Sequence, residues 1–232
     1  MISDRADIAE IFSSVQGEGL QIGRRQIFVR FNGCNLNCTF CDTYKSNVTN
    51  MRDADKVLDE IDNLNVSNIH NSVAITGGEP LLHSKFLKII LPKIRDRGLK
   101  VYLETNATLV KNLYDVIEYL DIISVDIKLP SVGHNKSCWQ EHKSFMKAAF
   151  EKEFFVKVVV SSSIEAEEFD KAIELVREMS FDIPFIIQPE TNKACLELNI
   201  SAEEILSLQE RALSRLNNVL VIPQAHKMMG MR

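Results

Sequence analysis

Short apolar runs alternate with amphipathic segments along most of the chain. The apolar runs are rich in β-branched and aromatic residues, which favour strands, and they cover residues 26–31, 72–76, 100–104, 121–126, 154–160, 184–188 and 219–222. The segments between them repeat apolar residues at three- and four-residue spacing, which predicts helices over 57–64 and near 84–97, 109–120, 139–152, 166–179 and 202–216. Strands that alternate with helices usually lie parallel in one sheet that the helices cover.

Capping residues agree with these boundaries. Asp53 and Ser201 stand at predicted helix starts, and Glu204 follows Ser201 by three residues, as in a capping box. Gly98 comes directly after the predicted helix end at 93–97, where a glycine commonly terminates a helix.

The number of strand–helix units decides which parallel fold these elements form. A closed eight-unit barrel takes about 250 residues, whereas the 232 residues here supply six or so units. Only 6 Pro and 9 Gly are spread along the chain, and no linker or low-complexity tract divides it. We therefore predict an α/β fold: a single domain over residues 1–232, built as an incomplete TIM-like barrel of about six parallel strands with reduced helices.

Composition narrows the class of protein. Hydrophobic residues make up 45% and charged residues 25%, as in ordinary soluble globular proteins. The 27 Lys and Arg against 32 Asp and Glu give a net charge of −5, which argues against direct nucleic-acid binding, because no excess of cations is present to neutralise phosphates. The first seven residues are too charged for a signal peptide, and no run of eighteen apolar residues occurs. We therefore expect a cytoplasmic protein without a membrane segment.

Polar and glycine-rich segments follow six of the predicted strands. In parallel α/β folds, ligands bind beyond the carboxyl ends of the strands, which meet at one edge of the sheet. The segments concerned are 32–34, 76–80, 104–106, 126–128, 188–190 and 224–227. Their positions predict that all six contribute to a single site.

Three of the five cysteines lie within eight residues. Cys34, Cys38 and Cys41 form a C-x3-C-x2-C motif, while Cys138 and Cys195 lie far along the chain and match no motif. An odd, clustered set in a cytoplasmic chain argues against a disulfide framework. A structural zinc site would require a fourth ligand. A [4Fe–4S] cluster held by three thiolates keeps one iron with an open position, as a reactive centre requires.

This cysteine motif beyond the first predicted strand, together with Thr-Gly-Gly-Glu-Pro at 76–80, resembles the radical S-adenosylmethionine (SAM) superfamily. The resemblance implies a partial-barrel fold and a [4Fe–4S] cluster whose fourth iron is chelated by SAM. Electron transfer from the cluster then cleaves SAM to a 5′-deoxyadenosyl radical. The resemblance also implies SAM contacts from the glycine-rich turn, from a segment ending in lysine after the fourth strand, and from a segment after the sixth. The residues concerned are Gly78, Asp126, Ile127, Lys128, Gln188, Pro189, Glu190 and Thr191. Of the Ser-Pro-Lys form common in the middle segment, only Lys128 is present here.

Five further segments, 12–19, 30–36, 40–43, 103–106 and 223–227, narrow the resemblance to the 7-carboxy-7-deazaguanine synthase family. Such a lyase converts 6-carboxy-5,6,7,8-tetrahydropterin into 7-carboxy-7-deazaguanine with release of ammonia, on the pathway to queuosine, a modified tRNA nucleoside, and related deazapurines. The resemblance implies Mg²⁺ as a further cofactor, regeneration of SAM and a homodimer. A flavodoxin or ferredoxin is the expected reductant.

The same resemblance assigns residues to the pterin and to Mg²⁺. Glu18 is expected to accept N–H groups of the pterin, and Arg30 to bind the substrate carboxylate, because a guanidinium matches carboxylate geometry. Thr43 is expected to hold Mg²⁺ through its hydroxyl oxygen. Apart from the resemblance, the position of residues 229–232 shortly after Lys227 predicts that this tail covers bound substrate. The complete set expected to bind substrate is Val15, Gln16, Gly17, Glu18, Arg30, Thr76, Glu104 and His226. The alternative role for Glu104 is a hydrogen bond to the ribose of SAM.

Three other classes of protein share parts of this pattern. A glycyl-radical-enzyme activase has the same cysteine motif and a small barrel, but it acts on a protein backbone and needs no pterin-binding residues. A non-catalytic zinc or iron–sulfur module would hold a metal without responding to SAM. A ferredoxin-like carrier requires a fourth cluster ligand, which this chain does not offer near the motif.

Overall fold

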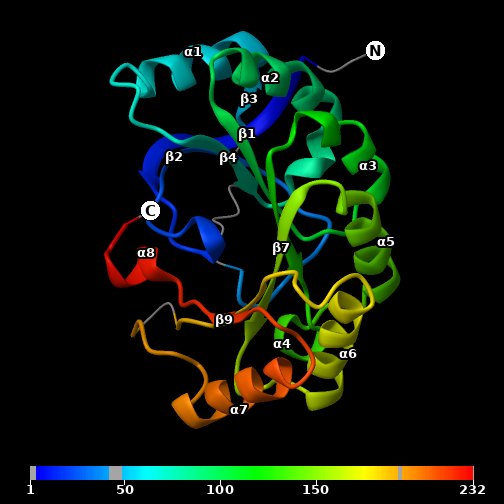
Figure 1. The fold of residues 1–232 in the computed structure, drawn as a ribbon. Helices are drawn as coiled ribbons and strands as arrows, with labels where there is room; N and C mark the ends of the chain where they lie inside the picture. The colour runs from blue at the N-terminus through cyan, green and yellow to red at the C-terminus, as the bar shows by residue number, and fades with distance from the viewer. Residues whose placement is uncertain (1–3, 42–48, 193–194, 232) are drawn as a thin grey trace.

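The computed structural model describes residues 4–41, 49–192 and 195–231 of the chain. A curved sheet of nine strands occupies the centre of this part of the chain, in the order β3-β1-β2-β4-β5-β6-β7-β8-β9 (Figure 1). β2 and β4 to β9 run parallel to one another, and β1 and β3 pair antiparallel at one edge. The strands are β1 (Arg5–Val15), β2 (Arg25–Phe31), β3 (Met51–Asp53), β4 (Ser72–Gly77), β5 (Lys100–Thr105), β6 (Ile122–Ile127), β7 (Glu153–Val160), β8 (Phe185–Pro189) and β9 (Val219–Val221).

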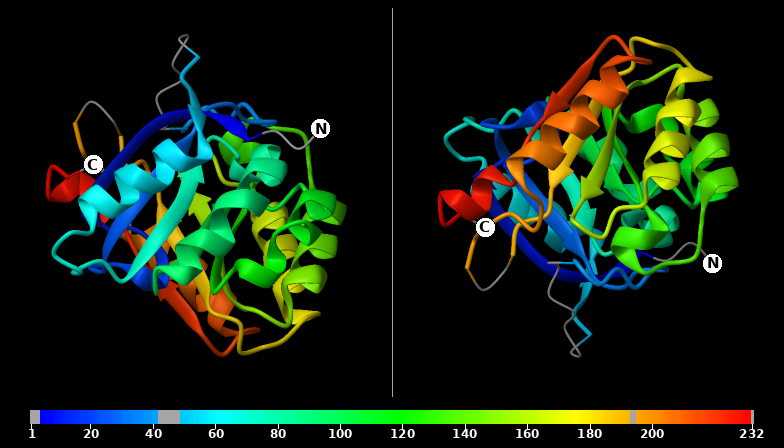
Figure 2. Two further views of the ribbon diagram at one scale, coloured as in Figure 1. Left: turned by 90° about the horizontal axis from the view of Figure 1, so that it is seen from above. Right: turned by 90° about the horizontal axis from the view of Figure 1, so that it is seen from below.

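Helices surround the outside of the curved sheet (Figure 2). They are α1 (Ala54–Leu64), α2 (Ser84–Asp96), α3 (Val110–Tyr114), α4 (Pro130–Gly133), α5 (Trp139–Ala149), α6 (Ala166–Arg177) and α7 (Ala202–Leu213). The short helix α8 (Ala225–Met228) instead contributes to the inner side, where His226 and Lys227 line the cavity described below. Three single turns of 3-10 helix are η1 (Gly19–Gln21), η2 (Pro80–His83) and η3 (Ile117–Tyr119). Among the described residues, no helix is both long enough and apolar enough to span a bilayer.

The predicted parallel fold is confirmed, and all seven predicted strands are present. The capping box of α7 is also confirmed, since Ser201 Oγ accepts from Glu204 N and the Glu204 carboxylate accepts from Ser201 N. Gly98 follows the end of α2 with φ +76°, the left-handed conformation that glycine adopts without strain. Asp53 stands at the start of α1 but makes no side-chain capping bond; its carboxylate pairs instead with Arg5 at 2.8 Å.

Several elements differ from the sequence prediction: β1, β3 and some short helical turns are not among the predicted elements, and one predicted helix is broken. β1 was not predicted, because its register against β2 shifts between Ile8 and Glu10, and this bulge interrupts the alternation of apolar and polar residues. The continuous helix predicted over 109–120 is wrong. The chain forms α3 and η3 instead, because Val116 leaves the helical conformation at φ −131° and places its side chain in the core.

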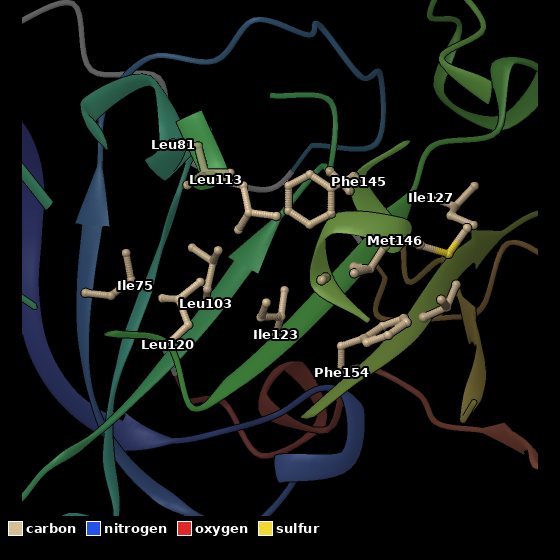
Figure 3. Close-up of a cluster of buried hydrophobic side chains, with 14 of the residues drawn as sticks. Ile75, Leu81, Leu103, Leu113, Leu120, Ile123, Ile127, Phe145, Met146 and Phe154 are labelled. Carbon is tan, nitrogen blue, oxygen red and sulfur yellow. The ribbon is translucent and has the colours of Figure 1, made fainter. Parts of the chain in front are cut away.

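The strands carry different side chains on their two faces, because successive side chains in a strand point to opposite sides. On the outer face, Ile75, Leu103 and Ile123 pack against helix residues such as Leu113 and Phe145 (Figure 3). On the inner face, an apolar layer lies below the polar residues of the site. This layer consists of Phe12, Phe28, Ala74, Tyr102, Ile122, Phe155 and Ile186. The inner positions two to four residues further along the parallel strands are polar, and they form the floor of the site described next.

Candidate active site

A cavity of about 380 Å³ opens at the carboxyl ends of the parallel strands. Six inward-pointing residues from successive strands line it above the apolar layer, as the alternation of strand side chains requires. They are Arg30, Thr76, Glu104, Asp126, Lys157 and Gln188. The predicted convergence of strand ends on one place is therefore confirmed.

Most of the predicted site residues line this cavity together. From the N-terminal loop and the strand ends these are Val15, Gln16, Gly17, Glu18, Arg30, Thr76, Gly78, Glu104, Asp126, Lys128, Gln188 and Glu190. From the cysteine loop and the C-terminal segment they are Cys34, Cys38, Cys41 and His226. The structure therefore brings the predicted cluster ligands, SAM contacts and substrate contacts to the walls of one cavity.

Four predicted residues are not among those that line it. Ile127 and Pro189 follow inward-pointing residues by one position, so strand alternation directs their side chains outward. Ile127 lies in the outer hydrophobic cluster (Figure 3). Thr191 is buried and forms an isolated bridge with Leu198. Thr43 lies outside the described residues. The roles assigned to these four residues stay predictions.

The cysteine loop leads directly from β2 into the cavity. Two asparagines from other segments contact its sulfurs: Asn106 Nδ2 lies 3.7 Å from Cys34 Sγ, and Asn135 Nδ2 donates to Cys38 Sγ at 3.0 Å. Burial raises the pKa of the Cys34 thiol. None of the three cysteines is in a disulfide, so the donor set fits an iron–sulfur cluster. As they stand, no three His, Cys, Asp or Glu side chains of the described chain are grouped closely enough to hold a metal ion.

The glycine-rich turn after β4 packs directly against the start of this loop. A Cβ on Gly77 would lie 2.2 Å from the Phe31 carbonyl oxygen, and a Cβ on Gly78 would lie 1.9 Å from the Gly33 carbonyl oxygen. Glu79 N donates to the same Gly33 oxygen at 2.9 Å. Only glycine allows these two backbone segments to approach so closely.

Glu79 fixes the turn from inside the protein. Its fully buried carboxylate accepts from Leu81 N at 3.0 Å, from Thr105 Oγ1 at 2.9 Å and from Asn106 N at 2.8 Å. Burial raises the pKa of Glu79 to about 7, even though these hydrogen bonds favour the ionised form. The carboxylate thus joins the glycine-rich turn to the end of β5, which also supplies Asn106 beside Cys34.

The loop after β1 is shaped by Gln16 and Glu104. Gln16 Nε2 donates to Gln26 Oε1 at 3.0 Å and to Glu104 Oε1 at 2.7 Å, while Gln16 Oε1 accepts from Glu18 N at 3.0 Å. Thr76 Oγ1 donates to the other oxygen of Glu104 at 2.6 Å. Burial raises the pKa of Glu104, and the nearby Glu18 carboxylate raises it further. Gln16 therefore holds the loop in place through its amide atoms, and Glu18 extends into the cavity.

Glu18 is held by a lysine that sequence reasoning missed. Its carboxylate forms an ion pair with Lys157 of β7 and accepts from Gln224 Nε2 at 2.8 Å. Burial alone would raise the pKa of Glu18, but the Lys157 ammonium and the Gln224 hydrogen bond hold it well below its usual range. A lysine inside the apolar run 154–160 was the available signal, of the same kind that identified Arg30 in β2.

Arg30 has an internal partner and also lines the cavity. Its Nη1 lies 2.5 Å from Glu10 Oε1, and its guanidinium lies 5.1 Å from the centre of the Phe12 ring. A guanidinium has five N–H donors, so this ion pair leaves donors for a ligand carboxylate. The role of Arg30 in binding substrate stays a prediction.

Two buried oxygens on the side of the cavity that is predicted to bind SAM have no hydrogen-bond donor among the described residues. They are Asp126 Oδ1 and Gln188 Oε1. The other oxygen of Asp126 pairs with Lys128 Nζ at 2.7 Å, and that ammonium lies 5.1 Å from the centre of the Phe40 ring in the cysteine loop. Buried acceptors without donors are costly unless a ligand satisfies them. The hydroxyl and amino groups of an adenosine moiety are donors of the required kind, so these residues fit SAM.

His142 of α5 supports this wall from behind. It is fully buried, and its Nε2 accepts from Lys128 N at 3.3 Å. Burial lowers the pKa of His142 from 6.5 to about 4. An imidazole that stays neutral in the folded state makes folding weaker as the pH falls, because the unfolded chain takes up a proton that the folded chain does not.

This linkage gives a stability prediction. Relative to a His142→Asn variant, the parent protein should lose up to about 3 kcal/mol of unfolding free energy as the pH falls from 6.5 through 4, since one pKa unit corresponds to about 1.4 kcal/mol. Urea unfolding at stepped pH measures the difference. The variants must be compared because Glu79, whose pKa is raised, contributes the opposite slope. A His134→Asn variant, changed at an exposed left-handed position, should show the same pH dependence of the unfolding free energy as the parent. If His142→Asn also showed that pH dependence, the assignment to His142 would be refuted.

Comparison with known proteins agrees with this geometry. The model of the radical SAM superfamily matches residues 28–198. The chain is 38% identical to the 7-carboxy-7-deazaguanine synthase of Geobacter sulfurreducens, with 97% of both chains covered. It is 34% identical to the 7-carboxy-7-deazaguanine synthase of Methanothermobacter thermautotrophicus, with 100% of both covered.

Solved structures share the fold. QueE from Escherichia coli superposes with a TM-score of 0.66 at 21% identity, covering 96% of this chain and 95% of that one. TYW1 with a lysine-pyruvate adduct bound superposes with a TM-score of 0.62 at 16% identity, covering 84% of this chain and 75% of that one. The family model and the sequence relatives show that the chain belongs to the 7-carboxy-7-deazaguanine synthase family of the radical SAM superfamily.

Proposed function

We propose that the cavity carries out the ring contraction of 6-carboxy-5,6,7,8-tetrahydropterin to 7-carboxy-7-deazaguanine with release of ammonia. The chain is thus a C–N lyase in the biosynthesis of queuosine and related deazapurines. The observation that supports this most is the convergence of three cysteines outside any disulfide, a close-packed glycine turn and an inner layer of polar and charged residues on one cavity.

The residues divide the cavity into two sides. Cys34, Cys38 and Cys41 would hold a [4Fe–4S] cluster, and Gly78, Asp126, Lys128, Gln188 and Glu190 would bind SAM beside it. When bound, the cluster and SAM supply the one-electron chemistry that begins the reaction. The turn at Gly78 brings backbone groups close to the cysteine loop, and the unpartnered oxygens of Asp126 and Gln188 accept hydrogen bonds from the nucleoside.

The pterin would occupy the side formed by the loop after β1. Lys157 keeps the Glu18 carboxylate ionised, so Glu18 can accept hydrogen bonds from the amino and ring N–H groups of the pterin. Arg30 would bind the substrate carboxylate with the guanidinium donors that Glu10 does not use. Val15, Gly17, Thr76, Glu104 and His226 complete this wall, with Gln16 holding its loop in place.

Mg²⁺ is proposed at Thr43, whose hydroxyl oxygen suits a hard cation. Thr43 follows Cys41, a residue of the cavity wall, by two positions. The ion would supply positive charge that stabilises negative charge on the substrate during the rearrangement. A homodimer, and a flavodoxin or ferredoxin as reductant, stay predictions from the family resemblance.

The function is tested by anaerobic reconstitution of the protein with iron and sulfide, followed by incubation with SAM, dithionite, Mg²⁺ and 6-carboxytetrahydropterin. Mass spectrometry should detect 7-carboxy-7-deazaguanine, with less product when Mg²⁺ is omitted. If SAM is cleaved but no deazapurine forms, the superfamily assignment stands and the substrate assignment is refuted. This is the result expected of an activase that acts on a protein. No SAM cleavage at all would refute the enzyme assignment.

The C-terminal tail gives a second prediction. Met231 lines the cavity, and its backbone N donates to the His226 carbonyl at 2.8 Å. Removing residues 229–232 should raise KM for the pterin about tenfold, the equivalent of about 1.4 kcal/mol of lost binding, with little change in kcat. Steady-state kinetics measure this, with Met228→Ala as a control because that side chain is 71% exposed. An unchanged KM in the truncated protein would exclude a role for the tail in covering substrate.

A further inference from the structure

A continuous line of hydrogen bonds and ion pairs crosses the cavity. It begins in the C-terminal segment, where Lys227 Nζ donates to Gln224 Oε1 at 2.6 Å and Gln224 Nε2 donates to Glu18. It continues through Lys157, which pairs with both Glu18 and Asp126, the second at 3.3 Å. It ends at Lys128, which pairs with Asp126 and lies over the Phe40 ring beside the cluster ligands.

Lys157 is the joint between the two sides of this line. Glu18 belongs to the proposed pterin side, and Asp126 to the proposed SAM side. The side chains of Lys157, Glu18 and Asp126 are only 10%, 17% and 14% exposed. Burial makes charge interactions stronger than they are in water, so the two carboxylates compete strongly for one ammonium.

Asp126 is held incompletely in this arrangement. Its Oδ2 takes both lysines, while its buried Oδ1 has no donor in the described part of the chain. The orientation of that free oxygen therefore depends on where Lys157 lies. When N–H groups of a pterin donate to Glu18, the attraction between the Glu18 carboxylate and the Lys157 ammonium weakens. The ammonium can then move toward Asp126.

We propose that Lys157 is a positioning residue that couples the two ligand sites, so that bound pterin strengthens the binding of SAM. The proposal rests on the assignment of Glu18 to the pterin and Asp126 to SAM under the proposed function. Coupling of this kind is reciprocal, so SAM strengthens pterin binding by the same factor. Tighter binding of SAM in the presence of pterin favours the protein with both ligands bound, so less SAM is bound and cleaved before substrate is present.

The test measures binding, separately from turnover. The reconstituted protein is kept unreduced, and anaerobic calorimetry gives the Kd of SAM with and without saturating 6-carboxytetrahydropterin. In the parent the pterin should lower the Kd of SAM at least about fivefold, within the usual range of allosteric coupling. In Lys157→Met the ratio should fall below about twofold, while Lys157→Arg, which keeps the charge and the donors, should retain most of it.

A second variant breaks the same joint from the other side. Asp126→Ser leaves the Lys157–Glu18 pair in place and removes the Asp126 carboxylate. It should also lower the ratio, and the double variant should lower it no further than either single change, since both remove one interaction. Asp126→Ser also tests the joint if Lys157→Met does not fold. Lys100→Met serves as a matched control, because Lys100 is an exposed strand lysine at the amino end of β5, away from the carboxyl ends where the cavity opens.

The outcomes separate this proposal from the proposed function. A parent protein that makes no deazapurine would refute the proposed function. A parent that makes the product but shows no coupling would overturn the role of Lys157. Full coupling in Lys157→Met and Asp126→Ser would overturn it too. Equal weakening in Lys100→Met would show a general effect on the fold, and would likewise overturn the proposal.

Discussion

Replacing Cys34, Cys38 or Cys41 with alanine should reduce deazapurine formation and SAM cleavage to less than about 1% of the parent rate. Changes in groups that only support a metal ligand already cost about 10- to 100-fold, so loss of a ligand should cost more. All three thiols line the cavity, and two of them contact asparagine side chains from other segments. Product by mass spectrometry and iron and sulfide content after reconstitution measure the effect.

The matched control for this prediction is Cys195→Ala. Cys195 is exposed, and its Sγ lies 3.6 Å from Glu197 Oε2 in a segment that does not line the cavity. This variant should keep parental activity and parental iron content. Activity retained in any of the three loop variants, or lost in Cys195→Ala, would contradict the assignment of the cluster to the cysteine loop.

The parallel strands could be predicted because local signals agree with the tertiary structure. Seven apolar runs became seven strands, since a strand buried on both faces needs apolar residues at successive positions. The polar residues that follow the runs marked the site for a topological reason: the carboxyl ends of parallel strands meet at one edge. The cysteine spacing indicated the chemistry, and the glycine turn indicated where two backbones approach.

The remaining features depend on distant contacts that no local pattern encodes. Lys157 and Glu18 are 139 positions apart, and only the curvature of the sheet brings them together. Strand alternation separates Asp126 from Ile127, and Gln188 from Pro189, although motif resemblance treated each pair alike. β1 could not be predicted from alternation, because the bulge between Ile8 and Glu10 changes which residues of the strand face the core.

The largest effect from a change outside the cysteines is expected at Gly78. An alanine there would place its Cβ 1.9 Å from the Gly33 carbonyl oxygen, far inside van der Waals contact. Both groups belong to backbone, so neither can rotate away, and the turn must move from the cysteine loop. Displacement of a binding group by about 1 Å can cost about 100-fold in rate, and we expect kcat/KM for SAM-dependent product formation to fall by at least that factor.

Gly98→Ala distinguishes this loss of close approach from the general cost of replacing a glycine. Gly98 has φ +76°, but a Cβ there would meet nothing within 4 Å. The substitution should therefore cost about 1 kcal/mol of stability through backbone strain, with unchanged kcat/KM. Gly78→Ala should instead lose more activity than stability. Anaerobic calorimetry should show weaker SAM binding, and the cysteine loop should bind iron less completely. Parental SAM affinity in Gly78→Ala would mean that the turn can separate from Gly33 without disturbing the site, and that SAM does not depend on the contact between these two backbones.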